Sequence, residues 1–125
     1  MVWRVHTAFD LLAGRLTQLR VTDQQVGEHL EIFDLQEGDL VVTDRANGLR
    51  ERIAFVLKRH ADLLVRLSPR NLPLQEENGK ALDVVRWLKG RHAPAGRVYS
   101  RTVWMLHQGQ RTALRWVAVR LRDCV

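Results

Sequence analysis

The sequence predicts a mixed α/β fold in its first half and a β-rich, strongly basic second half. Residues 1–62 alternate between the two-residue period of strands and the spacing of helices, in the order strand, strand, helix, strand, helix. They hold eight basic and ten acidic residues, a net charge of −2, whereas residues 63–125 hold twelve basic and four acidic residues, a net charge of +8. We therefore expect two parts, residues 1–62 and residues 63–125.

The first two expected elements form an antiparallel hairpin. Residues 2–9, "VWRVHTAF", and residues 15–22, "RLTQLRVT", both alternate in polarity, and a short turn that ends at Gly14 joins them. In the first strand, Trp3 lies on the face opposite to Arg4. In the second strand, strict alternation places Leu16 on one face together with Gln18 and Arg20. It places four residues on the opposite face: Arg15, Thr17, Leu19 and Val21.

The next element is predicted as a helix that begins at Thr22–Asp23. Its apolar positions are spaced four and three residues apart, as on one face of a helix: Val26, Leu30 and Phe33. After Gly38, the run "DLVV" is apolar enough to lie in the middle of a sheet that is covered on both faces. A second helix is expected over residues 49–60, with Arg52 outside its apolar stripe.

The sequence of the second half predicts mainly strands and turns. The run "DLLVRLSPRNLPL" is extended and contains two prolines, and "ENGK" indicates a type I′ hairpin turn. The run "ALDVVRWLKG" has helical spacing and a stop signal at Gly90. Two strand-like runs, "RVYSRTVWML" and "TALRWVAVRL", are joined by a turn at residues 107–110. Their aromatic residues predict a half-buried core face, with stacking on displaced bases as the alternative.

Composition narrows the class of protein. No apolar run approaches the length of about 20 residues that a membrane helix needs, and the N-terminus lacks the apolar core of a secretory signal, so we expect a cytoplasmic protein with no membrane partner. The single Cys124 has no other cysteine to pair with. The five histidines are not at the spacing of zinc ligands.

Arginine dominates the basic residues and accounts for 17 of the 20. Its planar guanidinium suits phosphate oxygens, so a nucleic acid is the natural partner for the basic half. The alternative is an arginine-rich solvated surface that reflects a GC-rich genome.

The stretch "GDLVVTDR" places Asp44 directly after a strand. Active sites of open α/β sheets gather outside the carboxyl ends of the strands, and a carboxylate there suits Mg²⁺. The alternative is structural, with Asp44 capping the following helix or pairing with Arg45 or Arg50.

Residues 3–75 resemble the middle of IS4-type transposases, which belong to the DDE class. The matching pieces follow in the family's order: a hairpin that begins with "WRVHTAFD", the segment "VTDQQVGEHLEIF", the strand "GDLVVTDR", a helix, and then "DLLVRLSPRNLPL". The family commonly has Gly-Tyr after "DR", whereas this chain has Ala46-Asn47-Gly48. The resemblance implies a partial RNase H-like mixed sheet with flanking helices, followed by a β-rich insertion segment.

The resemblance also implies roles for particular residues. Asp44 corresponds to the second carboxylate of the catalytic triad, which holds two Mg²⁺ or Mn²⁺ ions for DNA strand cleavage and transfer. The family's other two carboxylates correspond to positions before Met1 and after Val125, so we expect the chain to be inactive alone. Arg45 would steady the scissile phosphate or, alternatively, pair with Glu51 or another carboxylate.

Further along the chain, the resemblance nominates Arg66, Arg70 and Asn71 as contacts to DNA phosphates. The implied partner is DNA at transposon ends, and a homodimer is a further partner in full-length relatives. Two other interpretations stay open. The chain is a non-catalytic, basic nucleic-acid-binding module, or it is the product of a decayed reading frame that folds poorly because the core lacks its first strand and its last helix. An exposed sheet edge would then favour aggregation.

Overall fold

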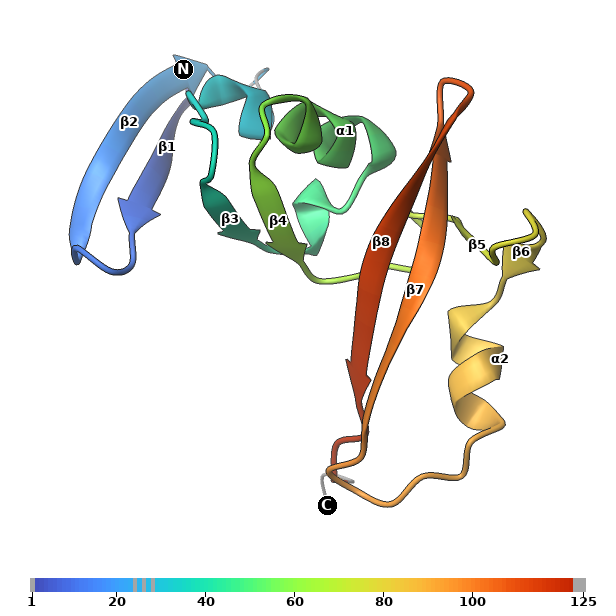
Figure 1. The fold of residues 1–125 in the computed structure, drawn as a ribbon. Helices are drawn as coiled ribbons and strands as arrows, with labels where there is room; N and C mark the ends of the chain where they lie inside the picture. The colour runs from blue at the N-terminus through green and yellow to red at the C-terminus, as the bar shows by residue number, and fades with distance from the viewer. Residues whose placement is uncertain (1, 24, 26, 28, 123–125) are drawn as a thin grey trace. The chain divides into compact units, whose positions relative to one another are not determined.

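The computed structural model describes residues 2–23, 25, 27 and 29–122 and shows a mixed α/β fold that is rich in strands (Figure 1). The chain divides into two compact units, Met1–Arg66 and Leu67–Val125. Within the described ranges the strands form two two-stranded sheets and one four-stranded sheet. The mixed α/β class is therefore confirmed, and the RNase H-like arrangement stays a prediction. No helix in the described part of the chain combines the length and the apolar character needed to cross a membrane.

The predicted N-terminal hairpin is confirmed. Strand β1 (Trp3–Asp10) pairs antiparallel with β2 (Arg15–Asp23). In the turn, Asp10 Oδ1 accepts hydrogen bonds from the backbone N–H groups of Leu12 (3.0 Å) and Ala13 (2.9 Å). Gly14 has a φ of +65°, a conformation that glycine adopts without the steric cost of a Cβ.

One expectation for the hairpin faces is wrong. The register shifts between Ala8 and Phe9, so that Ala8 pairs with Gln18 but Phe9 pairs with Leu16, which leaves Thr17 as the extra residue of a β-bulge. Leu16 therefore lies on the face of Phe9 and not on that of Gln18. Strict alternation could not anticipate this, because a bulge reverses the facing of every residue beyond it.

The helix predicted from Thr22–Asp23 is also wrong. Both residues belong to β2, and the only helical turn among the described residues between Asp23 and Leu40 is the 3₁₀ turn η1 (Leu30–Ile32). Val26, which contributed to the prediction, lies outside the described residues. The Thr22 hydroxyl shares a hydrogen bond of 2.7 Å with His6 Nε2 on the neighbouring strand. The pairing of Thr22 with the neighbouring strand therefore outweighs the local sequence signal for a helix start at Thr22–Asp23.

The remaining elements of the first unit form a strand–helix–strand arrangement. Strand β3 (Leu40–Thr43) and strand β4 (Asp62–Val65) are parallel, and helix α1 (Arg50–Lys58), which confirms the second predicted helix, connects them. A cluster of buried residues joins α1 to η1 and the start of β4, with Val41 and Leu63 packed against it: Leu30, Val56 and Ala61.

The expectation that the "DLVV" strand is covered on both faces is wrong for the described chain. Leu40 and Val42 are 64% and 54% exposed, although Val41 packs against the core cluster. A single strand–helix–strand arrangement covers one face of its two strands, because its one helix lies on one side of them (Figure 1). The apolar run alone could not distinguish one covered face from two.

The second unit contains the four-stranded sheet in the order β6-β5-β7-β8 and one helix. Its elements are β5 (Leu74–Gln75), β6 (Ala81–Leu82), α2 (Val84–Lys89), β7 (Val98–His107) and β8 (Gln110–Val119). The "ENGK" hairpin is confirmed, but its type I′ turn is wrong, because Gly79 has a positive φ and Asn78 does not. Two consecutive positive φ values, as a type I′ turn requires, occur instead at Gln108 (49°) and Gly109 (77°).

The core of the second unit lies on one face of the β7–β8 hairpin. Val103 and Met105 are each 1% exposed, and Trp116 is 8% exposed. The Trp87 ring of α2 makes edge-on contacts with Tyr99 and Trp116, at centroid distances of 5.5 and 5.4 Å. These rings serve the core, as favoured from the sequence, because edge-to-face aromatic packing fills the space between helix and sheet.

Candidate functional site

Asp44 lies directly after β3, at the carboxyl end of the strand, and its side chain is exposed. Its Oδ1 atom accepts a hydrogen bond of 3.0 Å from the backbone N–H of Ala46 and so caps the 3₁₀ turn η2 (Arg45–Asn47). Asp44 forms no ion pair with Arg45 in the described part of the chain. The capping role is present for this short turn but not for α1, whose N-cap residue is Leu49, and the hydrogen bond uses only the Oδ1 atom of the exposed carboxylate.

Buried polar contacts hold the turn that presents Asp44. The Asn47 side chain, 8% exposed, donates a hydrogen bond of 2.8 Å to Thr43 Oγ1 at the end of β3. Arg52 on α1 donates from Nη1 to the carbonyl oxygen of Ala46 (2.6 Å) and to Asn47 Oδ1 (3.2 Å). The helix therefore fixes the turn through one guanidinium, and the position of Asp44 depends on Arg52.

His29 completes this network on its outer side. Its Nδ1 atom lies 2.9 Å from Arg52 Nη2 and 3.9 Å from Glu31 Oε2. Because arginine can only donate, Nδ1 is the acceptor in the contact with Arg52.

Arg66 comes to the same edge of the sheet as Asp44. The parallel register pairs Thr43 with Val65, so that Asp44 and Arg66 both follow paired strand ends. A Cβ placed on Gly48 would lie 3.2 Å from the carbonyl oxygen of Arg66 and 3.3 Å from that of Arg45. The turn after β3 therefore packs directly against the backbone that leaves β4, and the contact is close because residue 48 is glycine.

The other predicted contacts divide between the two units. Arg45 is exposed and forms no ion pair with Glu51 in the described structure. Arg70 and Asn71 belong to the second unit, where both are exposed in a turn in which the Asn71 backbone N–H donates to the carbonyl oxygen of Ser68 (3.0 Å). The structure thus brings together Asp44, Arg45 and Arg66.

The described residues do not fit a two-metal centre by themselves. In the described part of the chain no three His, Cys, Asp or Glu side chains are grouped so that they could hold a metal ion. Asp44 offers one carboxylate, whereas a metal pair needs several oxygen ligands. We therefore derive no catalytic step from the residues of this chain.

Arginines of the second unit are partly engaged within it. Arg101 forms an ion pair with Glu76, Arg115 donates to Ser100 Oγ (3.0 Å), and the Arg111 guanidinium lies 4.8 Å from the centroid of Trp104. Contacts to a neutral hydroxyl or an aromatic face leave the positive charge uncompensated. The unit carries eleven basic and four acidic residues, a net charge of +7, and therefore has a strongly positive surface.

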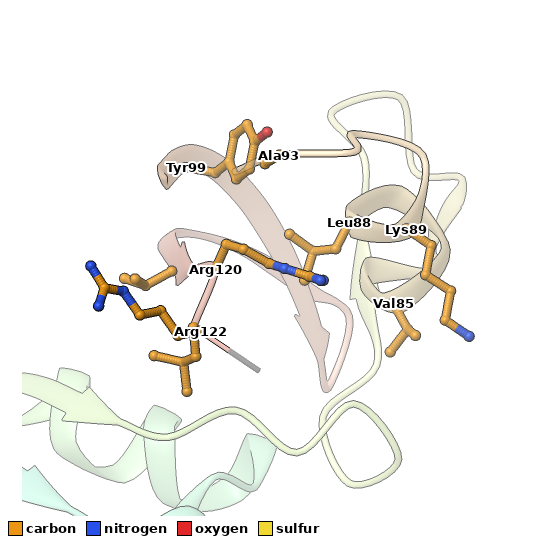
Figure 2. A pocket seen from close by; sticks show the side chains of 9 residues that line it. Val85, Leu88, Lys89, Ala93, Tyr99, Arg120 and Arg122 are labelled. Carbon is orange, nitrogen blue, oxygen red and sulfur yellow. The ribbon is translucent and has the colours of Figure 1, made fainter. Parts of the chain in front are cut away.

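A half-open pocket of about 450 Å³ lies in the second unit, between α2 and the end of β8 (Figure 2). Its walls are mainly apolar side chains, and Lys89, Arg120 and Arg122 contribute positive charge. No carboxylate of the described chain lines it. The pocket could hold an anionic group beside an apolar one, but it presents no paired acid and base for catalysis.

Comparison with protein-family models, curated proteins and solved structures finds no match to this chain. The interpretation of the site therefore depends on its geometry and on the sequence resemblance. Sequence reasoning did not single out Asn47 and Arg52, which hold the turn. The available signals were the departure from the family pattern at Ala46-Asn47-Gly48 and the position of Arg52 outside the apolar stripe of its helix.

Proposed function

We propose that this chain is part of an IS4-type DDE transposase and contributes a portion of its RNase H-like core and of its β-rich insertion. The activity of the whole protein would be metal-dependent DNA strand cleavage and transfer. One observation carries the proposal: Asp44, in the segment with the resemblance, is exposed at the carboxyl end of one of two parallel strands that a helix connects. Ligand sites of open α/β sheets occur at that edge.

Three residues have defined roles in this proposal. Asp44 is a ligand of Mg²⁺ or Mn²⁺, through the oxygen that does not cap η2. Arg45 and Arg66 lie at the same edge and bind the phosphates of the DNA. Arg70 and Asn71 extend phosphate binding into the basic unit. The remaining carboxylates of the centre belong to other parts of the transposase.

The metal role of Asp44 can be tested without activity. Mn²⁺ added to the isotopically labelled chain should broaden the amide NMR signals of residues 44–48 and of Arg66, because a bound paramagnetic ion relaxes nearby nuclei. The broadening should disappear in Asp44→Asn, whose amide oxygen can still accept the bond from Ala46.

The matched control is Asp10→Asn, since Asp10 also accepts backbone N–H bonds in a turn of the same unit. This variant should keep the broadening at residues 44–48. Signals that broaden equally in the original chain and in Asp44→Asn would rule out Asp44 as a ligand.

A second candidate function is that of a non-catalytic nucleic-acid-binding module, and the net charge of +7 on the second unit favours it. Both candidates predict DNA binding that weakens steeply with salt, because the basic side chains of the bound protein displace counterions from the phosphates. Arg70→Glu should lower the affinity and make the salt dependence shallower by about one phosphate contact. The control Arg15→Glu, in the acidic unit, should change little. If the original chain binds DNA but Mn²⁺ does not broaden the signals of residues 44–48, the second candidate is favoured.

A further inference from the structure

The pocket between α2 and the end of β8 has apolar walls that the fold of the second unit holds in place. Leu88 of α2, Tyr99 of β7 and Val119 of β8 contribute to these walls. The edge-on contacts of the Trp87 ring with Tyr99 (5.5 Å) and Trp116 (5.4 Å) tie α2 to the sheet. The helix wall and the strand wall therefore keep their spacing when the pocket is open to solvent.

Several apolar side chains of the pocket have surface that nothing in the described chain covers. Val85 is 45% exposed, Val119 is 52% exposed and Leu121 is 75% exposed, and all three line the pocket. The volume of about 450 Å³ is within the usual range for small-molecule sites. A compact apolar group in this space would remove that surface from water, which is favourable.

Arg120 supplies a positive charge beside the apolar walls. Its backbone N–H donates to the carbonyl oxygen of Arg97 (2.9 Å), and its own carbonyl oxygen accepts from the N–H of Gly96 (2.7 Å). Figure 2 shows its side chain directed from the end of β8 toward Leu88 of α2. A guanidinium presents parallel N–H donors that match the two oxygens of a carboxylate, and here it extends from a backbone that is held on both sides.

The surroundings of Arg120 favour a negative charge. Lys89 and Arg122 line the pocket, and their charged ends point away from Arg120 in Figure 2. They therefore make the electrostatic potential at the pocket more positive without converging on one anion. No Asp or Glu among the residues described lines the pocket, so no carboxylate of that part of the chain opposes an incoming anion there.

We propose that this pocket binds a small carboxylic acid as its anion. The carboxylate pairs with the Arg120 guanidinium, and a compact apolar body packs against Leu88, Tyr99 and Val119. A single carboxylate suits the pocket better than a chain of phosphates, because only one of its three cationic side chains is directed toward the apolar walls. The proposal depends neither on the role of Asp44 nor on DNA binding.

An NMR titration of the isotopically labelled chain with three probes tests both parts of this recognition. Phenylbutyrate should shift the amide signals of residues 85–89 and 119–121 until they saturate. Phenylbutanol has a similar apolar body without the charge, and it should bind at least about tenfold more weakly, because it cannot form the charge-assisted pair with Arg120. Acetate, which lacks the apolar body, should give no saturable shift.

Two pairs of variants locate the binding. Arg120→Gln should weaken phenylbutyrate binding about tenfold, whereas Arg115→Gln, at an exposed position of β8 outside the pocket, should leave it unchanged. Val119→Thr replaces a methyl group by a hydroxyl and should weaken binding about threefold. Val117→Thr is its control, since Val117 is also 52% exposed and does not line the pocket.

Four outcomes would overturn the proposal. They are the absence of a saturable shift with phenylbutyrate, equal affinity for phenylbutanol, equal weakening by the two arginine variants, and equal weakening by the two valine variants. A short DNA duplex that shifts the same signals when phenylbutyrate does not would also overturn it, because the pocket would then belong to a nucleic-acid surface. If Arg120→Gln does not fold, the comparison of the three probes and the valine pair still decides.

Discussion

At the scale of single residues, Asn47 has the strongest structural consequence in the candidate site. It is a buried polar side chain that bonds to both Thr43 and Arg52, whereas Asp44 beside it is exposed. A residue that departs from the family pattern thus has a structural reason to be asparagine here, because its amide both donates and accepts.

We expect Asn47→Ala to lower the free energy of unfolding by about 1–3 kcal/mol, because it leaves the partner groups on Thr43 and Arg52 without their bonds. Urea denaturation measures the change, and Gln36→Ala, at an exposed position of the same unit, should stay within about 0.5 kcal/mol of the original chain. If Asn47→Ala were as stable as Gln36→Ala, the result would show that the hydrogen bonds of Asn47 do not stabilise the turn.

At the scale of elements, the sequence predicted strands better than it predicted turns and faces. The β1–β2 hairpin and helix α1 follow from periodicity, because each has a regular pattern over about eight residues. The bulge at Thr17 and the extension of β2 through Asp23 depend on cross-strand contacts with β1, which a single segment does not encode. For the turn that presents Asp44, the sequence predicted only that Asp44 follows a strand. The contacts that hold the turn were not predicted, because Arg52 reaches it from the next helix.

The β7–β8 turn provides a prediction at this scale. Gln108 has a φ of 49°, a conformation that asparagine adopts at lower cost than glutamine, and the following Gly109 has a φ of 77°. Gln108→Asn should therefore raise the melting temperature slightly, with a stability gain of about 0.5 kcal/mol, and Gly109→Ala should lower stability by about 1 kcal/mol. Thermal unfolding followed by circular dichroism tests both. Changes in the same direction would show that the φ values do not control this turn.

At the scale of the whole molecule, charge and carboxylates are unevenly distributed between the units. The first unit, with nine basic and ten acidic residues, has a net charge of −1 and contains Asp44, whereas the second unit has a net charge of +7. Basic residues can bind DNA without a complete metal centre, because binding to phosphates needs only charge. Strand cleavage needs more, since one carboxylate cannot position both an attacking and a leaving oxygen through a metal pair.

We therefore expect the chain alone to bind supercoiled DNA and leave it intact in Mg²⁺ or Mn²⁺, with no nicked product on an agarose gel. A nuclease contaminant would nick the DNA equally in preparations of the original chain and of Asp44→Ala, so this variant is the necessary control. Nicking by the original chain that Asp44→Ala abolishes would contradict the prediction, because it would mean that the chain assembles a working centre around one known carboxylate. The other ligands would then have to come from this chain or from a second copy of it, and mixing Asp44→Ala with the original chain would distinguish the two sources.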